Sequence, residues 1–534
     1  MAKKKTFGSG ALVLGSTGLL CSAIGCVFRI ILANLIGQNG IAYYQMVYPL
    51  YSVLTVIASV GIPAAISRPV AHYLAMDDRD GANLMFKTAF WRLCLAGAAA
   101  TAALCVFAKP LAALQGMAEA YRLYYLIAPC VLLTVFIACL RGWFQGVMMM
   151  GMTATSQLIE ELGKTVLGLA FALFWRKLSP INGAFGAILG IPIAEAGALF
   201  YLLIGRLRAG RRRKTRYRIT TDMSRARALG RGIGLRSLPV ILGACIQPII
   251  LLIDNLLVVP MLRSMGFSVQ TAQARFGLVS GMINPVAFIA SSVGVAIAMS
   301  LVPTIAASAA LRRRDEVERN AAAGLKVTLL VALPCMAGLM LVGPALVRVL
   351  FRLSDPDSMA AAGTLMRSTA VSFFMLMLAQ TATAILQGVN HVRRPAVHLC
   401  IGTAAKLGAT WLLLRVLQGD IAAVGYGTLI GFTVTAALDL YSCAKIVHVR
   451  LDPVMHLVRP VFATLFMAVA VATVYFGLSI LVGESIAAFI GVLVGLITYP
   501  FAILRLQAVS SEDCRLLPHG IELEYFMHRI GWWI

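Results

Sequence analysis

The stretch RIILANLIGQNGIAYYQMVYPLYSVLTVIASVGIPAAISRP, from Arg29 to Pro69, decides the fold. It is apolar on both sides of a short polar break, which predicts two membrane-spanning helices. Arg29 stands among residues that belong in lipid, and an arginine at the middle of a membrane helix costs about 3 kcal/mol on insertion scales. Arg29 therefore requires a partner, a water-filled cavity or an anionic ligand. We interpret the rest of the chain as a scaffold around such a cavity.

The composition indicates a polytopic membrane protein. Of the 534 residues, 60% are hydrophobic and 13% are charged, against about 25% charged residues in soluble proteins. A soluble core cannot absorb so much apolar surface. Lys3, Lys4 and Lys5 precede an apolar run far longer than that of a signal peptide, so we expect no removable signal.

We predict an all-α protein with about fourteen transmembrane helices. Each apolar segment is long enough to cross roughly 30 Å of hydrocarbon at about 1.5 Å per residue. The segments are residues 11–36, 46–70, 89–108, 122–147, 153–175, 184–206, 238–262, 277–303, 327–351, 367–389, 396–417, 425–447, 461–482 and 487–507.

The net charge of +24 gathers in a few segments between these spans. The loop Arg206–Arg236 contains twelve basic residues and one acid. Cytoplasmic loops carry an excess of Lys and Arg, so this loop and the N-terminus are predicted inside, and an even number of helices also places the C-terminus inside. We expect the charge to contact anionic lipid rather than nucleic acid, for which the sequence contains no binding module.

The two halves of the chain repeat one another. In each half a glutamine-glycine-valine motif precedes a lysine by 19 positions, and a pair of glycines comes after the lysine. In the first half these residues are Gln145 to Val147, Lys164, Gly186 and Gly190. In the second half they are Gln387 to Val389, Lys406, Gly427 and Gly431. The offset is 242 residues for the motif and the lysine and 241 for the glycines.

The repeat predicts two parallel lobes. Each repeat unit holds six helices, an even number, so both enter the membrane in the same direction and can rock about a site at their interface. The predicted divisions are an N-lobe at 1–206, a basic cytoplasmic linker at 207–237, a C-lobe at 238–447, two further helices at 448–507 and a cytoplasmic tail at 508–534.

Prolines inside the predicted spans indicate bends. Pro49, Pro63, Pro248 and Pro285 each remove a backbone hydrogen bond and permit a kink. Pro49 and Pro285, paired across the lobes, are either bending points for closure or sites of static curvature.

Motifs spread over nearly the whole chain carry a family resemblance. They include Phe28-Arg29-Ile-Ile-Leu-Ala, Tyr44-Gln-Met-Val-Tyr-Pro-Leu-Tyr51, Gly61-Ile-Pro-Ala-Ala-Ile-Ser67 and Leu252-Ile-Asp-Asn-Leu-Leu-Val258. The chain resembles the stage V sporulation protein B family, which belongs with the lipid II flippases in the multidrug/oligosaccharidyl-lipid/polysaccharide exporter superfamily. The resemblance implies a fourteen-helix flippase of the bacterial plasma membrane. Such a protein moves polyprenyl-diphosphate-linked sugars from the inner to the outer leaflet through a central cavity.

Flipping breaks no bond, but it needs cations in the cavity to meet the diphosphate. Arginine offers paired donors and lysine a point charge. Arg29 resembles the first-helix arginine of the lipid II flippases and is either a diphosphate contact or an internal ion pair with Glu160 or Glu161. The other predicted cavity cations are Lys164, Lys406, Arg275 and Arg68. The alternative for Arg275 is a position at the membrane interface, and the alternative for Arg68 is an anchor of the positive-inside kind.

One helix concentrates three charged residues. Glu160 and Lys164 are spaced i, i+4 and can pair on one face, either around substrate or as a structural pair. Glu161 points elsewhere, towards the first helix. Glu160 and Glu161 are therefore candidates for ion pairing or for coupling.

Three further acids lie alone in predicted spans. Asp254 either contacts Lys406 or binds a coupling cation or proton. Glu195 and Asp439 are proton-relay candidates because they are intramembrane acids, and we expect both near an aqueous face.

The sequence indicates a transporter rather than an enzyme. It has no Walker loop for ATP and no His/Cys cluster for a metal, and single histidines such as His398 are interpreted as solvated or satisfied side chains. We expect no cofactor, with coupling to the membrane potential, Na⁺ or H⁺. Expected partners are a lipid-linked saccharide and membrane lipids. The alternatives are a cation-coupled multidrug antiporter of the same superfamily and a non-transporting scaffold that recruits wall-synthesis enzymes.

Overall fold

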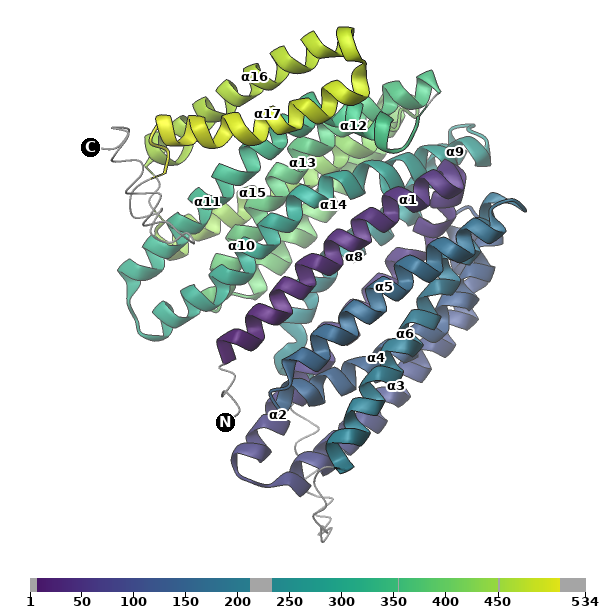
Figure 1. Cartoon of the computed structure of the whole chain (residues 1–534), viewed down its shortest axis with the longest axis vertical. Helices are drawn as coiled ribbons and strands as arrows, with labels where there is room; N and C mark the ends of the chain where they lie inside the picture. Colours follow the sequence, from purple (N-terminus) through teal and green to yellow (C-terminus); the bar gives the residue numbers. More distant parts are fainter. Residues whose placement is uncertain (1–6, 212–232, 354, 450–451, 510–534) are drawn as a thin grey trace. The chain divides into compact units, whose positions relative to one another are not determined.

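The computed structural model describes residues 7–211, 233–353, 355–449 and 452–509 (Figure 1). Within these ranges the chain is helical and contains no strand, which confirms the predicted fold class. Packing divides the chain into two compact units, Met1–Met282 and Ile283–Ile534, and each is described by itself. Most of the predicted linker at 207–237 and the tail beyond residue 509 lie outside the described residues.

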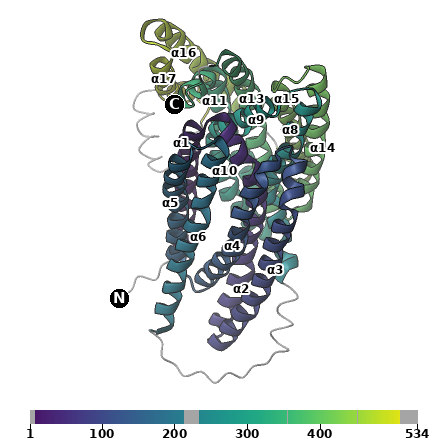
Figure 2. The same cartoon turned by 90° about the vertical axis from the view of Figure 1, so that its right-hand side faces the viewer.

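The first unit is built from long helices packed side by side. In it α4 packs on α2, α3 and α6, α5 packs on α6 and α1, and α8 and α9 pack on α1 (Figure 2). The helices are α1 (Phe7–Val56), α2 (Ile62–Ala75), α3 (Arg79–Leu114), α4 (Tyr121–Gly146), α5 (Met150–Trp175), α6 (Pro180–Arg211), α8 (Ile233–Ser264) and α9 (Val269–Gly277).

The second unit is organised around α13. Helices α10, α11 and α15 pack on α13, α14 packs on α15, and α16 and α17 form a hairpin that contacts α11 and α12. The helices are α10 (Asn284–Ala310), α11 (Arg314–Leu341), α12 (Gly343–Leu350), α13 (Pro356–Gly388), α14 (Arg393–Val416), α15 (Ala422–Val447), α16 (Arg459–Val482) and α17 (Glu484–Arg505). Packing thus groups α8 and α9 with the first unit, while the lobe boundaries drawn from the repeat stay predictions.

Every predicted span falls on a helix of the structure. Eleven helical stretches of the described residues are long and apolar enough to cross a membrane. The first, Leu20–Ala75, covers most of the predicted span 11–36 and all of the predicted span 46–70. Gly37 breaks the helix between them with φ 71° and ψ −178°, a conformation that L side chains avoid. Helix α5 is outside this set of eleven because it carries three charged residues.

Three helices begin well before the membrane spans that were predicted within them. Helix α3 starts at residue 79 rather than 89, α11 at 314 rather than 327, and α13 at 356 rather than 367. Hydropathy marks only the part of a helix that lipid requires to be apolar, whereas the backbone hydrogen bonds continue through the polar turns before it. The predicted span 327–351 is also divided, because α11 ends at Leu341 and α12 begins at Gly343.

Proline explains the widened turns of the helices. Three π-helical segments, Ile57–Gly61, Leu278–Ile283 and Val454–Val458, each end two residues before a proline. Proline lacks the N–H that would bond to the carbonyl four residues earlier, and the widened turn accommodates that loss. Pro63 and Pro285, two of the prolines at which a kink was predicted, therefore each follow a local widening of the helix.

The repeated glycines mark the closest approach of paired helices. A Cβ atom on Gly186 of α6 would lie 2.5 Å from the carbonyl oxygen of Phe171 on α5, and one on Gly190 would collide with the backbone of Gly168. In the second unit a Cβ atom on Gly431 of α15 would lie 2.6 Å from Cβ of Lys406 on α14. The sequence repeat therefore corresponds to a shared way of packing two helices backbone to backbone.

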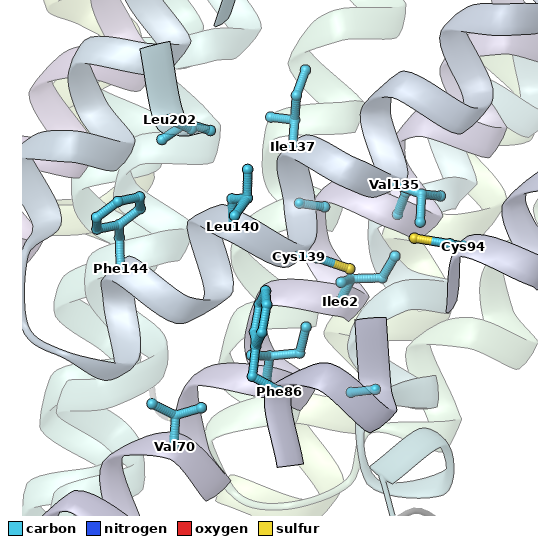
Figure 3. Close-up of a cluster of buried hydrophobic side chains, with 14 of the residues drawn as sticks. Ile62, Val70, Phe86, Cys94, Val135, Ile137, Cys139, Leu140, Phe144 and Leu202 are labelled. Carbon is cyan, nitrogen blue, oxygen red and sulfur yellow. The ribbon is translucent and has the colours of Figure 1, made fainter. Parts of the chain in front are cut away.

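An apolar core supports this arrangement in the first unit (Figure 3). Ile62, Ile66 and Val70 of α2 pack with Phe86 of α3 and Phe144 of α4, and all five are buried. Gly146 contributes by leaving room for Val70, which would lie 2.7 Å from an added Cβ atom. The core thus fixes α2, α3 and α4 next to the polar side chains that α4 shares with α5.

We expect Gly190→Ala to destabilise the protein by about 1–3 kcal/mol, because the added methyl group has no space against Gly168. Gly197→Ala on the same helix is the matched control, since an added Cβ atom there meets nothing within 4 Å. Thermal unfolding in one detergent measures both. Equal melting temperatures for the two variants would contradict the proposed close approach.

Candidate functional site

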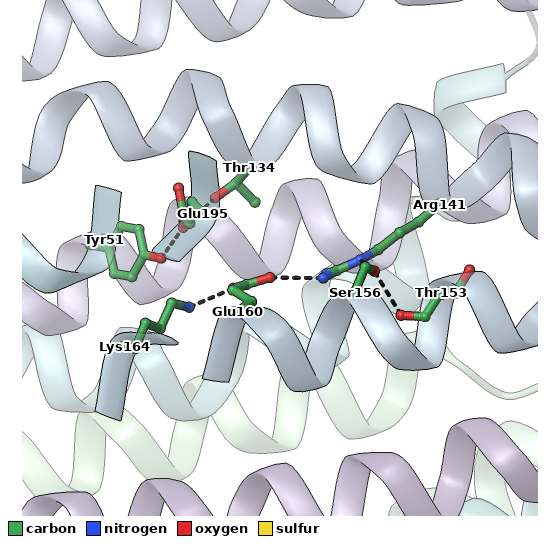
Figure 4. A network of polar contacts seen from close by, with 8 residues as sticks. All are labelled: Tyr51, Thr134, Arg141, Thr153, Ser156, Glu160, Lys164 and Glu195. Carbon is green, nitrogen blue, oxygen red and sulfur yellow. Dashed lines mark hydrogen bonds and ion pairs between the residues drawn. The ribbon is translucent and has the colours of Figure 1, made fainter. Parts of the chain in front are cut away.

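The first unit contains a buried charge cluster on α4 and α5 (Figure 4). The carboxylate of Glu160 accepts from Arg141 Nη2 at 2.8 Å through one oxygen and from Lys164 Nζ at 2.5 Å through the other. The three side chains are only 9%, 17% and 19% exposed, in the order Arg141, Glu160, Lys164. One carboxylate therefore holds two cations, and this group of three residues retains a net positive charge.

A hydroxyl extends the cluster along α5. Arg141 Nε donates to Ser156 Oγ at 2.9 Å, and Ser156 Oγ donates to the carbonyl of Thr153 at 2.7 Å. The structure places Lys164 on Glu160 at the i, i+4 spacing from which that pair was expected. Sequence reasoning missed Arg141, although a basic residue in the apolar segment 122–147 was a signal of the same kind as Arg29.

Arg29 lies on an aromatic surface of α1. Its guanidinium carbon is 5.3 Å from the ring centroid of Tyr48, and Tyr48 stacks on Tyr44 with centroids 5.3 Å apart. Glu160 is paired with other cations, whereas Glu161 lies against α1, because a Cβ atom on Gly25 would be 2.8 Å from its Oε1. Glu161 therefore points towards the first helix, one turn from Arg29.

Glu195 of α6 forms a second polar centre beside the cluster. Its Oε1 accepts from Tyr51 at 2.5 Å and from Thr134 at 3.1 Å, while Oε2 is buried without a hydrogen-bond partner (Figure 4). Lys164 Nζ lies 5.9 Å from the Tyr51 ring. The expectation that Glu195 lies near an aqueous face was wrong: the residue is fully buried, because α1, α4 and α6 close around it.

The second unit buries Asp439 in the same way. It is fully buried on α15, where it contacts His398 of α14 at 2.7 Å and accepts from Thr383 of α13 at 2.9 Å. The expected aqueous position of Asp439 was therefore also wrong. His398, interpreted as a solvated or satisfied side chain, is a partner of this acid, and its separation of 41 residues from Asp439 gives no signal in the sequence.

The remaining candidates are dispersed. Lys406 is buried on α14, Arg68 is exposed on α2, and the guanidinium of Arg275 lies 4.3 Å from the Phe267 ring centroid. Asp254 lies on α8 in the first unit and Lys406 in the second, so the contact expected between them stays a prediction. Across the described ranges no group of three or more His, Cys, Asp or Glu side chains is placed to hold a metal.

These features define a class of protein. In the part of the chain that the structure describes, helices long and apolar enough to span a membrane, some with buried cations, define a multi-pass membrane protein. More particularly, the chain belongs to the polysaccharide biosynthesis protein family, whose model matches residues 7–309. This confirms the resemblance drawn from the motifs near Arg29 and Tyr44.

Three relatives from Bacillus subtilis (strain 168) extend over most of the chain. The chain is 26% identical to the uncharacterized membrane protein YabM, over 99% of this chain and 98% of the relative. It is 22% identical to stage V sporulation protein B, over 84% of this chain and 85% of the relative. It is 24% identical to lipid II flippase MurJ, over 80% of this chain and 81% of the relative.

Solved structures show the same fold. The inward closed conformation of lipid II flippase MurJ matches with a TM-score of 0.67 at 12% identity, over 92% of this chain and 98% of that one. An inward-facing multidrug resistance transporter of the MATE family matches with a TM-score of 0.64 at 15% identity, over 80% and 94%. At these identities the likeness establishes the fold alone.

We expect Glu160→Gln to lower the unfolding free energy by about 3 kcal/mol, because it leaves Arg141 and Lys164 buried without their shared countercharge. Glu161→Gln is the matched control, since the neighbouring Glu161 forms neither of these ion pairs. Thermal unfolding in nanodiscs measures the difference. A loss of the same size in both variants would show that Glu160 has no special structural role.

Proposed function

We propose that this protein is a flippase that moves a polyprenyl-diphosphate-linked saccharide, lipid II or a related wall or polysaccharide precursor, from the inner to the outer leaflet by alternating access. The family and the names of the relatives support this cargo class. The observation that carries it is the group of cations Arg29, Arg141 and Lys164 within the membrane helices of the first unit. We place the protein in the bacterial plasma membrane, with both termini in the cytoplasm.

The cations differ in how they are held. Arg141 and Lys164 share one carboxylate, whereas the contact of Arg29 is an aromatic ring. None of the described carboxylates forms an ion pair with Arg29. A diphosphate offers several anionic oxygens, and a guanidinium can donate to two of them at once. Arg29 is therefore the proposed first contact of the diphosphate, with the Tyr48 ring as its resting partner.

The charge of the cargo bears on the energy source. Moving an anion outward is favoured by an inside-negative potential by about 2.3 kcal/mol per charge per 100 mV. The membrane potential can thus contribute to transport, and coupling to H⁺ or Na⁺ is a further proposed source. Glu195 is a candidate coupling residue because one of its buried oxygens has no partner among the described groups.

A cation-coupled multidrug antiporter is the second candidate, favoured by the likeness to the MATE-family structure. Its cargo is expected to be cationic or neutral, and the net positive cluster around Glu160 disfavours a cation there. A scaffold that recruits wall-synthesis enzymes would act through the basic loop and the tail, which lie mostly outside the described residues.

We expect Arg29→Ala to abolish headgroup exposure of fluorescent lipid II in liposomes that contain the protein, and Arg29→Lys to retain part of it. Arg122→Ala is the matched control, because Arg122 also lies over a tyrosine ring, that of Tyr121, but is exposed. The readout is protein-dependent accessibility of the headgroup to an external quencher.

Each outcome of this experiment has a distinct meaning. Equal exposure with wild type and Arg29→Ala would retain the flippase and assign Arg29 a structural role. No exposure with folded wild type would contradict lipid II as cargo and direct the search to other lipid-linked saccharides or to drugs.

A further inference from the structure

Three helices of the second unit meet at one buried carboxylate. Asp439 of α15 is fully buried, its Oδ1 lies 2.7 Å from His398 Nδ1 on α14, and its Oδ2 accepts from Thr383 Oγ1 on α13 at 2.9 Å. The His398 side chain is 14% exposed. Protein therefore encloses the carboxylate completely, whereas part of the imidazole is left uncovered.

Apart from His398, the side-chain partner of Asp439 in the described part of the chain is a neutral hydroxyl. From α13 the contact is a neutral hydroxyl, and on α15 itself Cys443 donates its thiol to a backbone carbonyl of α13. On α14 the nearest basic residue along the chain is Arg394, four residues before His398, and Lys406 is eight residues after it, about 12 Å along the helix. On α15 Lys445 is six residues after Asp439. On α11 Lys326 lines a groove with Glu318 and Arg319. His398 is thus the ionisable group in direct contact with this acid.

The sequence repeat gives this site a counterpart with different chemistry. The offset of 242 residues places Thr383 at the position of Arg141 and His398 at the position of Ser156. In the first unit Arg141 donates directly to Ser156 and to Glu160 of α5, whereas in the second unit Thr383 and His398 each contact Asp439 of α15. A guanidinium stays charged at every physiological pH, whereas an imidazole titrates near neutrality. One unit therefore joins its helices through a guanidinium and the other through an imidazole.

We propose that His398, Asp439 and Thr383 form a proton-binding site in the second unit. With a proton on both ring nitrogens, the imidazolium neutralises the carboxylate and joins α14 to α15. When the proton on Nε2 leaves to water, Nδ1–H stays on Asp439, and the pair carries one uncompensated negative charge in an apolar surrounding, which weakens the junction. The role of this proton as the coupling ion of transport rests on the proposed function. The existence of the proton-binding site does not.

The test is hydrogen exchange of the cargo-free protein in nanodiscs at about pH 6 and about pH 8, on either side of the usual range of an imidazole. After correction for the intrinsic pH dependence of exchange, segments around Thr383, His398 and Asp439 should be better protected at the lower pH. One linked proton changes the local opening constant by up to about tenfold per pH unit. The effect should vanish in His398→Gln and in Asp439→Asn.

Two controls separate titration from packing. His391→Gln should retain the pH effect, because His391 contacts the backbone carbonyl of Val389 rather than a carboxylate. Thr383→Val should lower protection at both pH values and retain their difference, because it removes only a hydroxyl. Asp439→Asn serves as the second test of titration if His398→Gln does not fold.

The proposal is overturned if wild type shows no pH-dependent protection here, or if the difference persists in both His398→Gln and Asp439→Asn. Neither result tests the flippase proposal, because no cargo is present in the measurement. Conversely, a failure to move lipid II in liposomes would leave the proton site standing and remove only its role in coupling.

Discussion

The carboxylate of Glu160 is the contact on which the first unit depends. Helices that face lipid cannot leave a cation unpaired at low cost, and Glu160 pairs with cations from two different helices at once. This contact lets α4 and α5 carry Arg141 and Lys164 inside an apolar bundle. Arg29, held on Tyr48 instead, is left as the cation most able to change partners.

Close helix packing provides the frame for these charges. The glycines of α6 and α15 bring backbones together, so the side chains nearby are fixed in position rather than free to find other partners. In the second unit Gly431 packs on the stem of Lys406, and in the first Gly190 packs on Gly168, one turn beyond Lys164. The same packing therefore positions a lysine in each half of the repeat.

Much of the fold was predictable because lipid imposes a simple rule on sequence. Apolar segments had to be helices, and Gly37 ended the first one where the apolar run was interrupted. The Glu160–Lys164 pair could be predicted because it lies within one helix, where the spacing fixes the geometry. Arg141 on Glu160 and His398 on Asp439 could not, because those contacts join helices whose rotation about their axes the sequence does not specify.

The widened turn Ile57–Gly61 has a consequence for the faces of one continuous helix. Tyr51 and Ile62 are eleven residues apart, about three turns, and would share a face of a regular α-helix. A π-helical turn adds about one residue and so rotates the residues after it by about 100°. Tyr51 consequently faces Glu195, while Ile62 faces the apolar core. A single inserted residue thus allows one stretch of chain to serve a polar site and a hydrophobic core in succession.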